Sequence, residues 1–373
     1  MDALTTPSNW QRVRLGDIGK PCMCKRVMKH QTTRYGEIPF YKIGTFGNTA
    51  DAFISKKLFL EYKTKYSFPK KGDILISASG TIGRAVIYDG KPAYFQDSNI
   101  VWIDNDETLV KNDFLFYAYS NIKWNTEHTT ILRLYNDNFR NTLIPLPPLN
   151  EQIAIANILS DVDHYLYSLD ALILKKESVK KALSFELLSQ RKRLKGFNQA
   201  WQRVRLGDIA NYLTSNLSVE QITQQGKIKV YDVNNFIGYT DTTFISDKPY
   251  ISIVKDGSVG RVRILPPKTN ILSTMGALIA NHRTTTEFLF YLLSNFDFKN
   301  FTSGSIIPHI YFKDYKEKTI FLPPLNEQIA IANILSALDN EIISLKNKKR
   351  QFDNIKKALN HDLMSAKIRV LKK

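Results

Sequence analysis

Two arginines follow glycine-containing turns at matching places in the chain. Ser79-Gly80-Thr81-Ile82-Gly83 leads to Arg84, and Gly257-Ser258-Val259-Gly260 leads to Arg261. Glycine lets a backbone approach a partner closely. A guanidinium group can bind a guanine edge through two parallel hydrogen bonds, or it can clamp a phosphate. The turns therefore predict contacts with nucleic acid, and for each residue taken singly a solvated loop position is an equally good interpretation.

The remaining candidates for DNA contact are polar or basic residues in or near predicted loops. In the first half of the chain they are Lys42, Thr45, Ser77, Ser79, Thr81, Arg84, Thr130 and Arg133, and in the second half Lys255, Ser258, Arg261, Arg263, Ser303, Ser305 and His309. The formal net charge is +17 and the isoelectric point about 9.6. This excess favours a polyanionic partner over a protein that is merely basic.

Sequence patterns of catalysis are largely absent. The chain has no G-x-x-x-x-G-K-[ST] loop, no H-E-x-x-H and no N-P-P-[YF] tetrapeptide. Glu61-Tyr62-Lys63, with Asp51 upstream, fits a nuclease pattern, but such a triplet is expected by accident among 52 lysines and arginines. We therefore predict no catalytic residue and no metal site in this chain.

Cys22 and Cys24 are interpreted as ordinary thiols in a reducing compartment. No signal peptide and no apolar stretch long enough to span a membrane is evident. We expect a cytoplasmic protein without a membrane partner.

Two segments occur twice. LPPLNEQIAIANILS occupies 146–160 and 322–336, and WQRVRLGDI occupies 10–18 and 201–209. The opening copies lie 191 residues apart and the closing copies 176, so the globular part of the second unit is 15 residues shorter. The chain is thus predicted to hold two copies of one unit, with constant ends and a different middle.

Each unit is predicted to be a mixed α+β domain followed by a long helix. Strands are expected at 40–43, 73–77 and 85–88, and a short helix over 112–120, capped by Asn112 and packed in the core. A further helix should start at Asn150, as its N-cap, and extend to about Lys195, roughly 65 Å at 1.5 Å per residue. The predicted domains are 1–149 and 198–325, and the predicted long helices are 150–197 and 326–373.

Both long helices carry one narrow apolar seam, so each needs a partner helix. The seams contain Ile155, Leu159, Val162, Leu166, Leu169, Ile173, Leu183 and Leu187, and then Ile331, Leu335, Leu338, Ile342, Leu345, Phe352, Ile355 and Leu359. A two-fold relation between the units would make the helices antiparallel. We expect an antiparallel coiled coil with the two domains at opposite ends, and we expect most lysines and arginines of the helices to lie on its solvated outer face.

With these motifs the chain resembles the specificity subunit (HsdS) of type I restriction-modification systems. The resemblance rests on the repeated WQRVRLGDI opening, on KKGDILISASGTIG (70–83) and on PLPPLNEQ (145–152), and it covers essentially the whole chain. It implies two target-recognition domains that alternate with two long antiparallel helices. In this family each domain contacts one half of a split double-stranded DNA target, and the helices set the gap.

The resemblance also implies partners. Two modification subunits would carry the S-adenosylmethionine chemistry and methylate adenine, and two restriction subunits, as optional partners, would carry the ATP- and magnesium-dependent functions. No cofactor is expected in this chain. KKGDILISASGTIG in the first half becomes KPYISIVKDGSVG (248–260) in the second, which implies different half-sites and an asymmetric target.

The identical segments at the helix starts favour docking of two copies of one partner. The candidate docking residues are Glu151, Gln152, Asn157, Glu327, Gln328 and Asn333. Recent internal duplication is the alternative explanation of the identity. Two rival functions are kept: a structural adaptor that binds acidic proteins, and a nuclease centred on Glu61.

Overall fold

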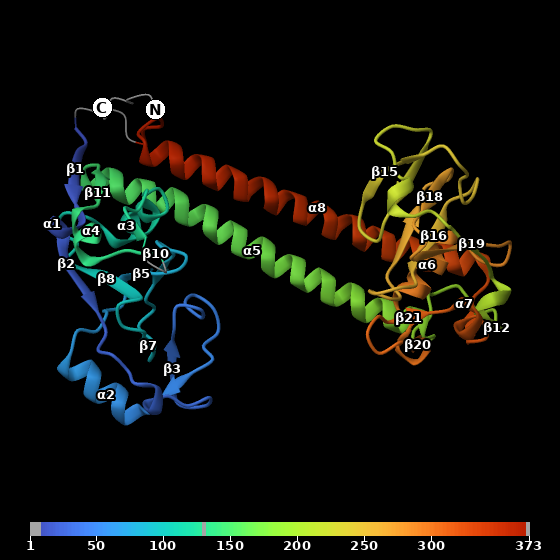
Figure 1. The fold of residues 1–373 in the computed structure, drawn as a ribbon, viewed down its shortest axis with the longest axis horizontal. Coiled ribbons are helices and arrows are strands. Elements are labelled where there is room, and N and C mark those ends of the chain that lie inside the picture. Colours follow the sequence, from blue (N-terminus) through green and yellow to red (C-terminus); the bar gives the residue numbers. More distant parts are fainter. Residues whose placement is uncertain (1–8, 129–131, 371–373) are drawn as a thin grey trace. The chain divides into compact units, whose positions relative to one another are not determined.

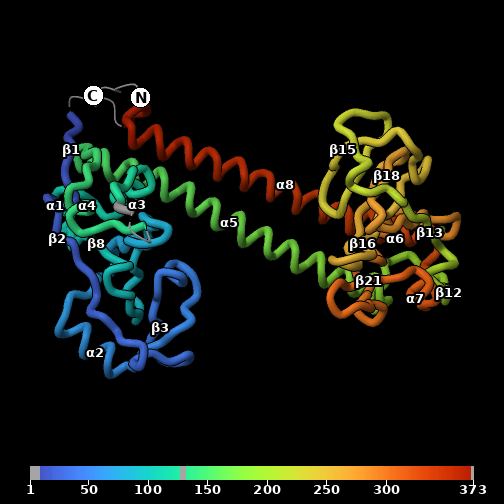
Figure 2. Tube along the Cα trace, in the orientation of Figure 1, coloured from blue at the N-terminus to red at the C-terminus, as the bar shows by residue number. Residues whose placement is uncertain are grey.

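The structure is a computed structural model that describes residues 9–128 and 132–370. Thr130, one of the predicted DNA-contacting residues, lies outside the described residues. The chain divides into two units, and each long helix contributes one half to each of them (Figure 2). Unit 1 combines residues 1–169 and 348–373, and unit 2 consists of residues 170–347.

The globular part of unit 1 is a mixed α+β domain. Its elements are β1 (Gln11–Arg14), α1 (Leu15–Ile18), β2 (Gly19–Met23), a 3-10 turn (Lys29–Gln31), β3 (Ile38–Tyr41), β4 (Phe53–Ile54), α2 (Lys56–Lys65), β5 (Ile74–Ser77), β6 (Ala85–Ile87), β7 (Tyr94–Phe95), β8 (Ile100–Asn105), α3 (Asn112–Tyr119), β9 (Glu127–His128), β10 (Leu132–Arg133), α4 (Asn136–Asn141) and β11 (Leu143–Leu146). The four-stranded sheet has the order β2-β8-β5-β6 and is antiparallel throughout. A three-stranded sheet, β4-β3-β7, contains one parallel pair, β3 with β7.

The four-stranded sheet separates two cores, because successive side chains of a strand point to opposite faces. In β8, Val101 and Ile103 pack on the side of α3 and α5, whereas Ile100 and Trp102 pack on the side of the three-stranded sheet. Figure 1 shows this second sheet and α2 on the side of the domain away from α5. The helix α3 confirms the short helix predicted at 112–120 and its place in the core, but its N-cap is Lys111. Asn112 is instead the first helical residue, and its side chain accepts a hydrogen bond from Asn105 Nδ2 (2.9 Å).

Unit 2 repeats this sheet topology, and its sequence differs between the two repeated segments. Its elements are β12 (Gln202–Arg205), a 3-10 turn (Leu206–Asp208), β13 (Ala210–Thr214), a 3-10 turn (Val219–Gln221), β14 (Ile228–Tyr231), β15 (Phe236–Thr240), β16 (Tyr250–Val254), β17 (Val262–Leu265), β18 (Thr269–Ile271), β19 (Met275–Ala280), α6 (Thr286–Ser294), a 3-10 turn (Lys299–Phe301), β20 (Thr302–Ser303), β21 (His309–Ile310), α7 (Phe312–Tyr315) and β22 (Thr319–Leu322). The sheet orders β13-β19-β16-β17 and β15-β14-β18 correspond strand by strand to those of unit 1.

Most of the length difference between the units lies between β4 and β5 of unit 1 and between the equivalent strands β15 and β16 of unit 2. In unit 1 helix α2 lies between β4 and β5, whereas in unit 2 only residues 241–249 connect β15 to β16, and no described element there corresponds to α2. In each unit the repeated opening segment pairs with the strand before the long helix, β1 with β11 and β12 with β22. The constant segments therefore lie together and frame the variable middle.

The two long helices are α5 (Leu149–Leu188) and α8 (Leu325–Met364), each 40 residues. The predicted extension of α5 to Lys195 is wrong: the helix ends at Leu188, and Gln190 has a positive φ of 62° that breaks the helical path. Asn150 lies inside the first turn and does not cap it, although its Oδ1 accepts a hydrogen bond from the backbone of Glu151 (3.0 Å). None of the described helices is long and apolar enough to cross a membrane.

Within each unit the two helices pair in antiparallel fashion, as predicted. In unit 1, Tyr165 packs against Phe352 with ring centroids 4.6 Å apart, and Asp163 pairs with Lys356. In unit 2, Lys176 pairs with Glu341 (2.7 Å). Most predicted seam residues are buried or half-buried, but Ile355 is 50% exposed and lies outside the seam. The fold is thus α+β, with two mixed domains and two long paired helices.

Candidate nucleic-acid interface

The two glycine-containing turns have the same backbone structure. In the β5–β6 turn, Gly83 donates its backbone N–H to Ser77 O (2.9 Å), and Gly80 and Gly83 have φ values of 66° and 83°. In the β16–β17 turn, Gly260 donates to Val254 O (2.9 Å), and Gly257 and Gly260 have φ values of 84° and 80°. Because L-residues rarely adopt such angles, both glycines of each turn are required by the backbone.

The second glycine of each turn also packs against an aromatic side chain. A Cβ atom on Gly83 would lie 2.0 Å from Trp124 Nε1, and one on Gly260 would lie 2.6 Å from Phe298 Cδ2. Either substitution would displace the ring beneath the turn. The match between the turns confirms that Arg84 and Arg261 occupy equivalent positions.

A short hairpin lies beside each turn. In unit 1, the β9–β10 hairpin reaches the turn through the backbone bond from Leu134 N to Ala78 O (2.9 Å). In unit 2, the β20–β21 hairpin reaches the turn through the backbone bond from Ile310 N to Lys255 O (2.9 Å). An isolated β-bridge pairs turn and hairpin in each unit, Ser79 with Arg133 in unit 1 and Asp256 with His309 in unit 2. The structure therefore brings Arg133 and His309, both predicted from sequence, to equivalent places beside the turns.

A third loop, which follows β3 or β14, meets the arginine of the turn. Arg84 Nη2 donates to Gly47 O (3.3 Å). In unit 2, Arg261 Nη2 donates to Asn234 Oδ1 (2.9 Å) and Arg263 Nη1 donates to Asn234 O (2.9 Å). Asn234 was not singled out by sequence reasoning, because only the fold brings it to the turn. Arg263 is further held over the ring of Tyr231, 5.2 Å from the centroid.

In unit 1 a cavity of about 490 Å³ lies beside the hairpin and the loop that follows β3, and no residue of the glycine turn lines it. The residues that line it are Arg26, Val27, Lys29, Thr32, Phe40, Lys42, Ala52, Gln96, Asp97, Ser98, Asn99 and Arg133. Two of them, Lys42 and Arg133, were predicted. Arg26 and Lys29 were missed, since nothing in their local sequence distinguishes them from other surface cations. Arg26 Nε donates to Asp97 Oδ2 (2.8 Å), which orients a guanidinium that is otherwise exposed.

Three predicted side chains of unit 1 instead hold the loops together. Ser77 is buried, its hydroxyl accepts from Arg84 N (3.0 Å), and it donates to Thr81 O. Ser79 is buried as well and donates to Asn99 Oδ1 (2.8 Å). Thr45 Oγ1 accepts from Lys42 N (3.1 Å). The prediction that Ser77 and Ser79 contact bases is corrected, because a buried, bonded hydroxyl cannot reach a base edge.

The other predicted residues lie at the surface of these loops. Thr81 and Arg84 are exposed in unit 1, and Lys42 forms an ion pair with Asp51 (2.8 Å). In unit 2, Ser258, Ser303 and Ser305 are exposed.

Two predicted side chains of unit 2 meet at Asp256. His309 Nδ1 lies 2.6 Å from Asp256 Oδ1, and Lys255 Nζ lies 3.6 Å from Asp256 Oδ2. Lys255 also shares a cavity of about 360 Å³ with Lys313 and Lys316, which gives the second interface its own cluster of cations.

Four of the predicted docking residues are buried inside their own units. Glu151 and Glu327 are 2% and 0% exposed, and each accepts a hydrogen bond from a tryptophan indole, Trp10 or Trp201 (both 3.0 Å). Each carboxylate also binds an arginine: Arg369 Nε lies 2.7 Å from Glu151 Oε1, and Arg193 Nη2 lies 2.7 Å from Glu327 Oε2.

The neighbouring glutamines are fully buried. Gln152 accepts from Lys111 N (2.8 Å), and Gln328 accepts from Thr284 Oγ1 (2.8 Å). The prediction that Glu151, Gln152, Glu327 and Gln328 face a partner is therefore wrong. They join each domain to the start of its long helix. Asn157 and Asn333 are exposed and remain candidates.

Several helix cations are also engaged within the protein. Lys176 and Lys346 bind Glu341 and Glu177 across the helix pair, at 2.7 and 2.6 Å. Lys176 is half-buried there, whereas Lys346 is exposed, as expected of the solvated face. In the nuclease-like triplet, Glu61 pairs with Lys65 (3.1 Å), whereas Lys63 lies over the ring of Phe68, 5.2 Å from its centroid. Both side chains thus have structural partners.

The repeated domains, each with a glycine turn and cations on the loops beside it, define a protein with two nucleic-acid recognition modules. A model of the type I restriction modification DNA specificity domain matches residues 7–176 and again 198–352. The chain therefore belongs to this family. It is a type I restriction-modification specificity subunit with two target-recognition domains, and its role is DNA sequence specificity.

Individual relatives agree. A provisionally named type I restriction enzyme specificity subunit of Haemophilus influenzae is 64% identical over 148 residues, which is 39% of this chain and 38% of that protein's length. The MjaVIII specificity subunit of Methanocaldococcus jannaschii is 26% identical over 99% of this chain and 95% of its own. The crystal structure of the specificity subunit from M. genitalium has the same fold, with a TM-score of 0.64, 20% identity, and coverage of 97% of this chain and 98% of that one.

Proposed function

We propose that each recognition domain binds one half of a split, asymmetric DNA target and that the long helices set the spacer between the halves. The observation that carries this proposal is the shared frame around divergent loops: the turn, hairpin and arginine coincide, while Thr81 and Arg133 in one unit are replaced by Ser258 and His309 in the other. Different side chains at equivalent places favour different bases, because sequence is read by side chains at base edges.

The chain is proposed to act without a catalytic site of its own. Two modification subunits would bring S-adenosylmethionine and methylate adenine, and two restriction subunits, where the system has them, would bring the ATP- and magnesium-dependent functions. The exposed loops support this division, because their arginines and serines are suited to binding a base and not to modifying it chemically. A location in the cytoplasm, where the DNA is, belongs to the same proposal.

Arg84→Ala and Arg261→Ala should each relax one half of the target. Losing an arginine that binds a base should reduce discrimination by about 1–3 kcal/mol at one position. Methylation-sensitive sequencing of host DNA would show a split adenine-methylated motif that degenerates in one half only for each variant. Deleting the chain should abolish the motif. A motif that survives the deletion, or that is continuous, would contradict the proposal.

Docking of two modification subunits is proposed at an exposed face that is identical in both units. On α5, Leu149 and Ile153 are 40% and 46% exposed and lie on one helix face with Asn157, because residues four apart are neighbours. On α8, Leu325 and Ile329 are 45% and 49% exposed, and they lie likewise with Asn333. This face replaces the buried Glu-Gln pairs as the partner surface.

Ile329→Asp should reduce the number of bound modification subunits from two to one, since a charge in an apolar contact is costly to desolvate. Native mass spectrometry of the assembled complex would measure the stoichiometry. Leu174→Asp is the matched control, because Leu174 is exposed on α5 but has an arginine, Arg350, at the corresponding place in α8. If the Leu174 variant lost a subunit and the Ile329 variant did not, the docking face would lie elsewhere.

A further inference from the structure

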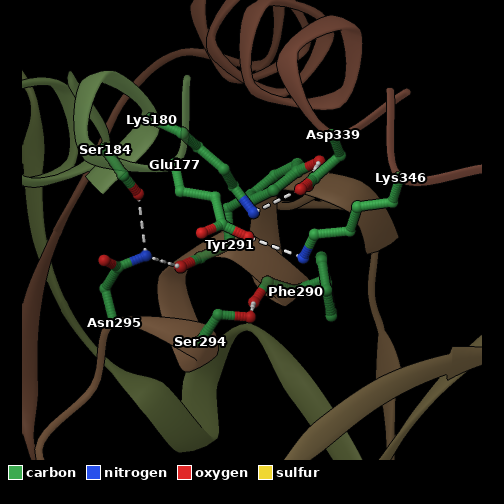
Figure 3. A network of polar contacts seen from close by, with 9 residues as sticks. All are labelled: Glu177, Lys180, Ser184, Phe290, Tyr291, Ser294, Asn295, Asp339 and Lys346. Atoms are coloured by element: carbon green, nitrogen blue, oxygen red, sulfur yellow. Dashed lines mark hydrogen bonds and ion pairs between the residues drawn. The ribbon is translucent and has the colours of Figure 1, made fainter. Parts of the chain in front are cut away.

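In unit 2 one carboxylate joins three elements. Asp339 of α8 accepts a hydrogen bond from the hydroxyl of Tyr291 on α6 (2.8 Å), and its other oxygen binds Lys180 Nζ of α5 (Figure 3). Lys180 Nζ also lies 5.7 Å from the centroid of the Tyr291 ring. Each of the three side chains therefore contacts the other two, and together they tie the recognition domain to both long helices.

Unit 1 contains the same triad. Asp163 accepts from the hydroxyl of Tyr117 on α3 (2.8 Å) and binds Lys356 of α8, whose Nζ lies 5.7 Å from the Tyr117 ring centroid. The aspartate now comes from α5 and the lysine from α8, so the two helices have exchanged roles. The residues around the aspartates differ, Asp161-Val162 in one helix and Ala337-Leu338 in the other. The triad is thus retained where the neighbouring sequence has diverged.

A second hydrogen bond beside each triad persists although its long-helix residue has changed. In unit 2, Asn295 Nδ2 at the end of α6 donates to Ser184 Oγ of α5 (2.8 Å), as Figure 3 shows. In unit 1, Asn360 Nδ2 of α8 donates to Ser120 Oγ at the end of α3 (2.6 Å). The donor comes from the domain in one unit and from the long helix in the other. The domain carries the same Ser-Asn pair in both units, Ser120-Asn121 and Ser294-Asn295, so the contact has been kept although its long-helix residue has changed.

We propose that these triads are positioning devices that fix the angle of each recognition domain on the helix pair and thereby restrict the spacer length. This inference rests on the proposed function. Adding one base pair to the spacer moves a half-site by about 3.4 Å and rotates it by about 35°. Apolar packing of α3 and α6 is non-directional and would let a domain rotate on the helices to follow the displaced half-site. Hydrogen bonds are directional and resist this rotation.

Tyr117→Phe and Tyr291→Phe remove the bond to the aspartate and leave the ring in place. Combined in one chain, they should reduce the preference for the native spacer over spacers one base pair longer or shorter by about tenfold. The full chain with its modification subunits would be tested on DNA with fixed half-sites and varied spacers, with adenine methylation as the readout. Ser184→Ala should also reduce the preference for the native spacer, but by less. It provides a second test of the inference if the double variant folds poorly.

Two controls separate positioning from general stability. Tyr167→Phe changes a tyrosine of α5 that is 76% exposed, and Glu177→Gln breaks the pair with Lys346, which joins only the helices. Both should keep the native spacer preference at unchanged melting temperature. Folded tyrosine variants with wild-type preference would overturn the inference. Absence of any split methylated motif with the unaltered chain would instead refute the proposed function.

Discussion

Arg193→Ala should lower the unfolding free energy of unit 2 by about 3 kcal/mol, or its melting temperature by roughly 6–12 °C. Arg193 supplies two hydrogen bonds to Glu327, whose side chain is fully buried. Without the arginine, the carboxylate keeps the indole of Trp201 and the positive end of the helix dipole of α8. These partners do not replace a full positive charge, so a buried charge stays largely uncompensated.

The loss should be confined to unit 2. Hydrogen exchange followed by mass spectrometry should show faster exchange in β12, β22 and the start of α8, while unit 1 keeps its protection. Adding Glu327→Gln should recover part of the stability, because the neutral amide has no charge to compensate. Arg205→Ala is the matched control: it removes an exposed ion pair with Glu317 and should leave the midpoint unchanged. A wild-type midpoint for Arg193→Ala would show that the indole of Trp201 and the helix dipole are sufficient partners for the buried Glu327 side chain, and would contradict the prediction.

The framework of the fold could be predicted from the sequence because it depends on local and repeated sequence patterns. The duplicated segments identified two units, and helical periodicity identified the two seams. The glycine turns identified Arg84 and Arg261 as equivalent, and the matching backbone bonds confirm it. The prediction failed at the end of α5, because a run without glycine or proline does not reveal a left-handed residue such as Gln190.

The role of the repeated Glu-Gln pair could not be predicted in this way. Glu151 binds Arg369, which is 218 residues away, and Glu327 binds Arg193, which is 134 residues away. Identity between the repeats indicates that both copies are under the same constraint. It does not indicate whether these side chains pack into the core or face a partner. The burial of the pair, and the exposure of the adjacent Ile153 and Ile329, became apparent only once α5 and α8 were placed against their domains.

The base-contacting residues are the least predictable part of the candidate site. Ser77 and Ser79 have suitable chemistry but are buried, Ser77 bonded within the turn and Ser79 bonded to Asn99. Arg26 and Asn234 instead join these surfaces from distant loops. Hydroxyl groups in glycine turns often satisfy the turn's own backbone. Residue type therefore selects candidates, and only the fold determines which of them face outward.

Inserting four residues into each long helix, after Leu169 and after Asn347, should lengthen the spacer by about two base pairs and leave both half-sites unchanged. Four residues add about 6 Å to a helix, and two base pairs of B-DNA rise about 6.8 Å. These positions separate the helix halves of unit 1 from those of unit 2, so the cross-helix pairs Asp163–Lys356 and Lys176–Glu341 stay within their own units.

A seven-residue insertion at the same positions provides the quantitative check. It adds about 10.5 Å, keeps the heptad phase of the seam, and should lengthen the spacer by about three base pairs. Insertion into α5 alone is the control, because it moves one apolar seam past the other and should abolish activity without creating a new spacer. Sequencing of methylated DNA reports half-sites and spacer together. An unchanged spacer in both paired insertions, or altered bases in either half-site, would show that the helices do not measure the gap. A spacer that lengthens in proportion to the insertion would show that helix length sets the distance along the DNA, separately from the loops that read the bases.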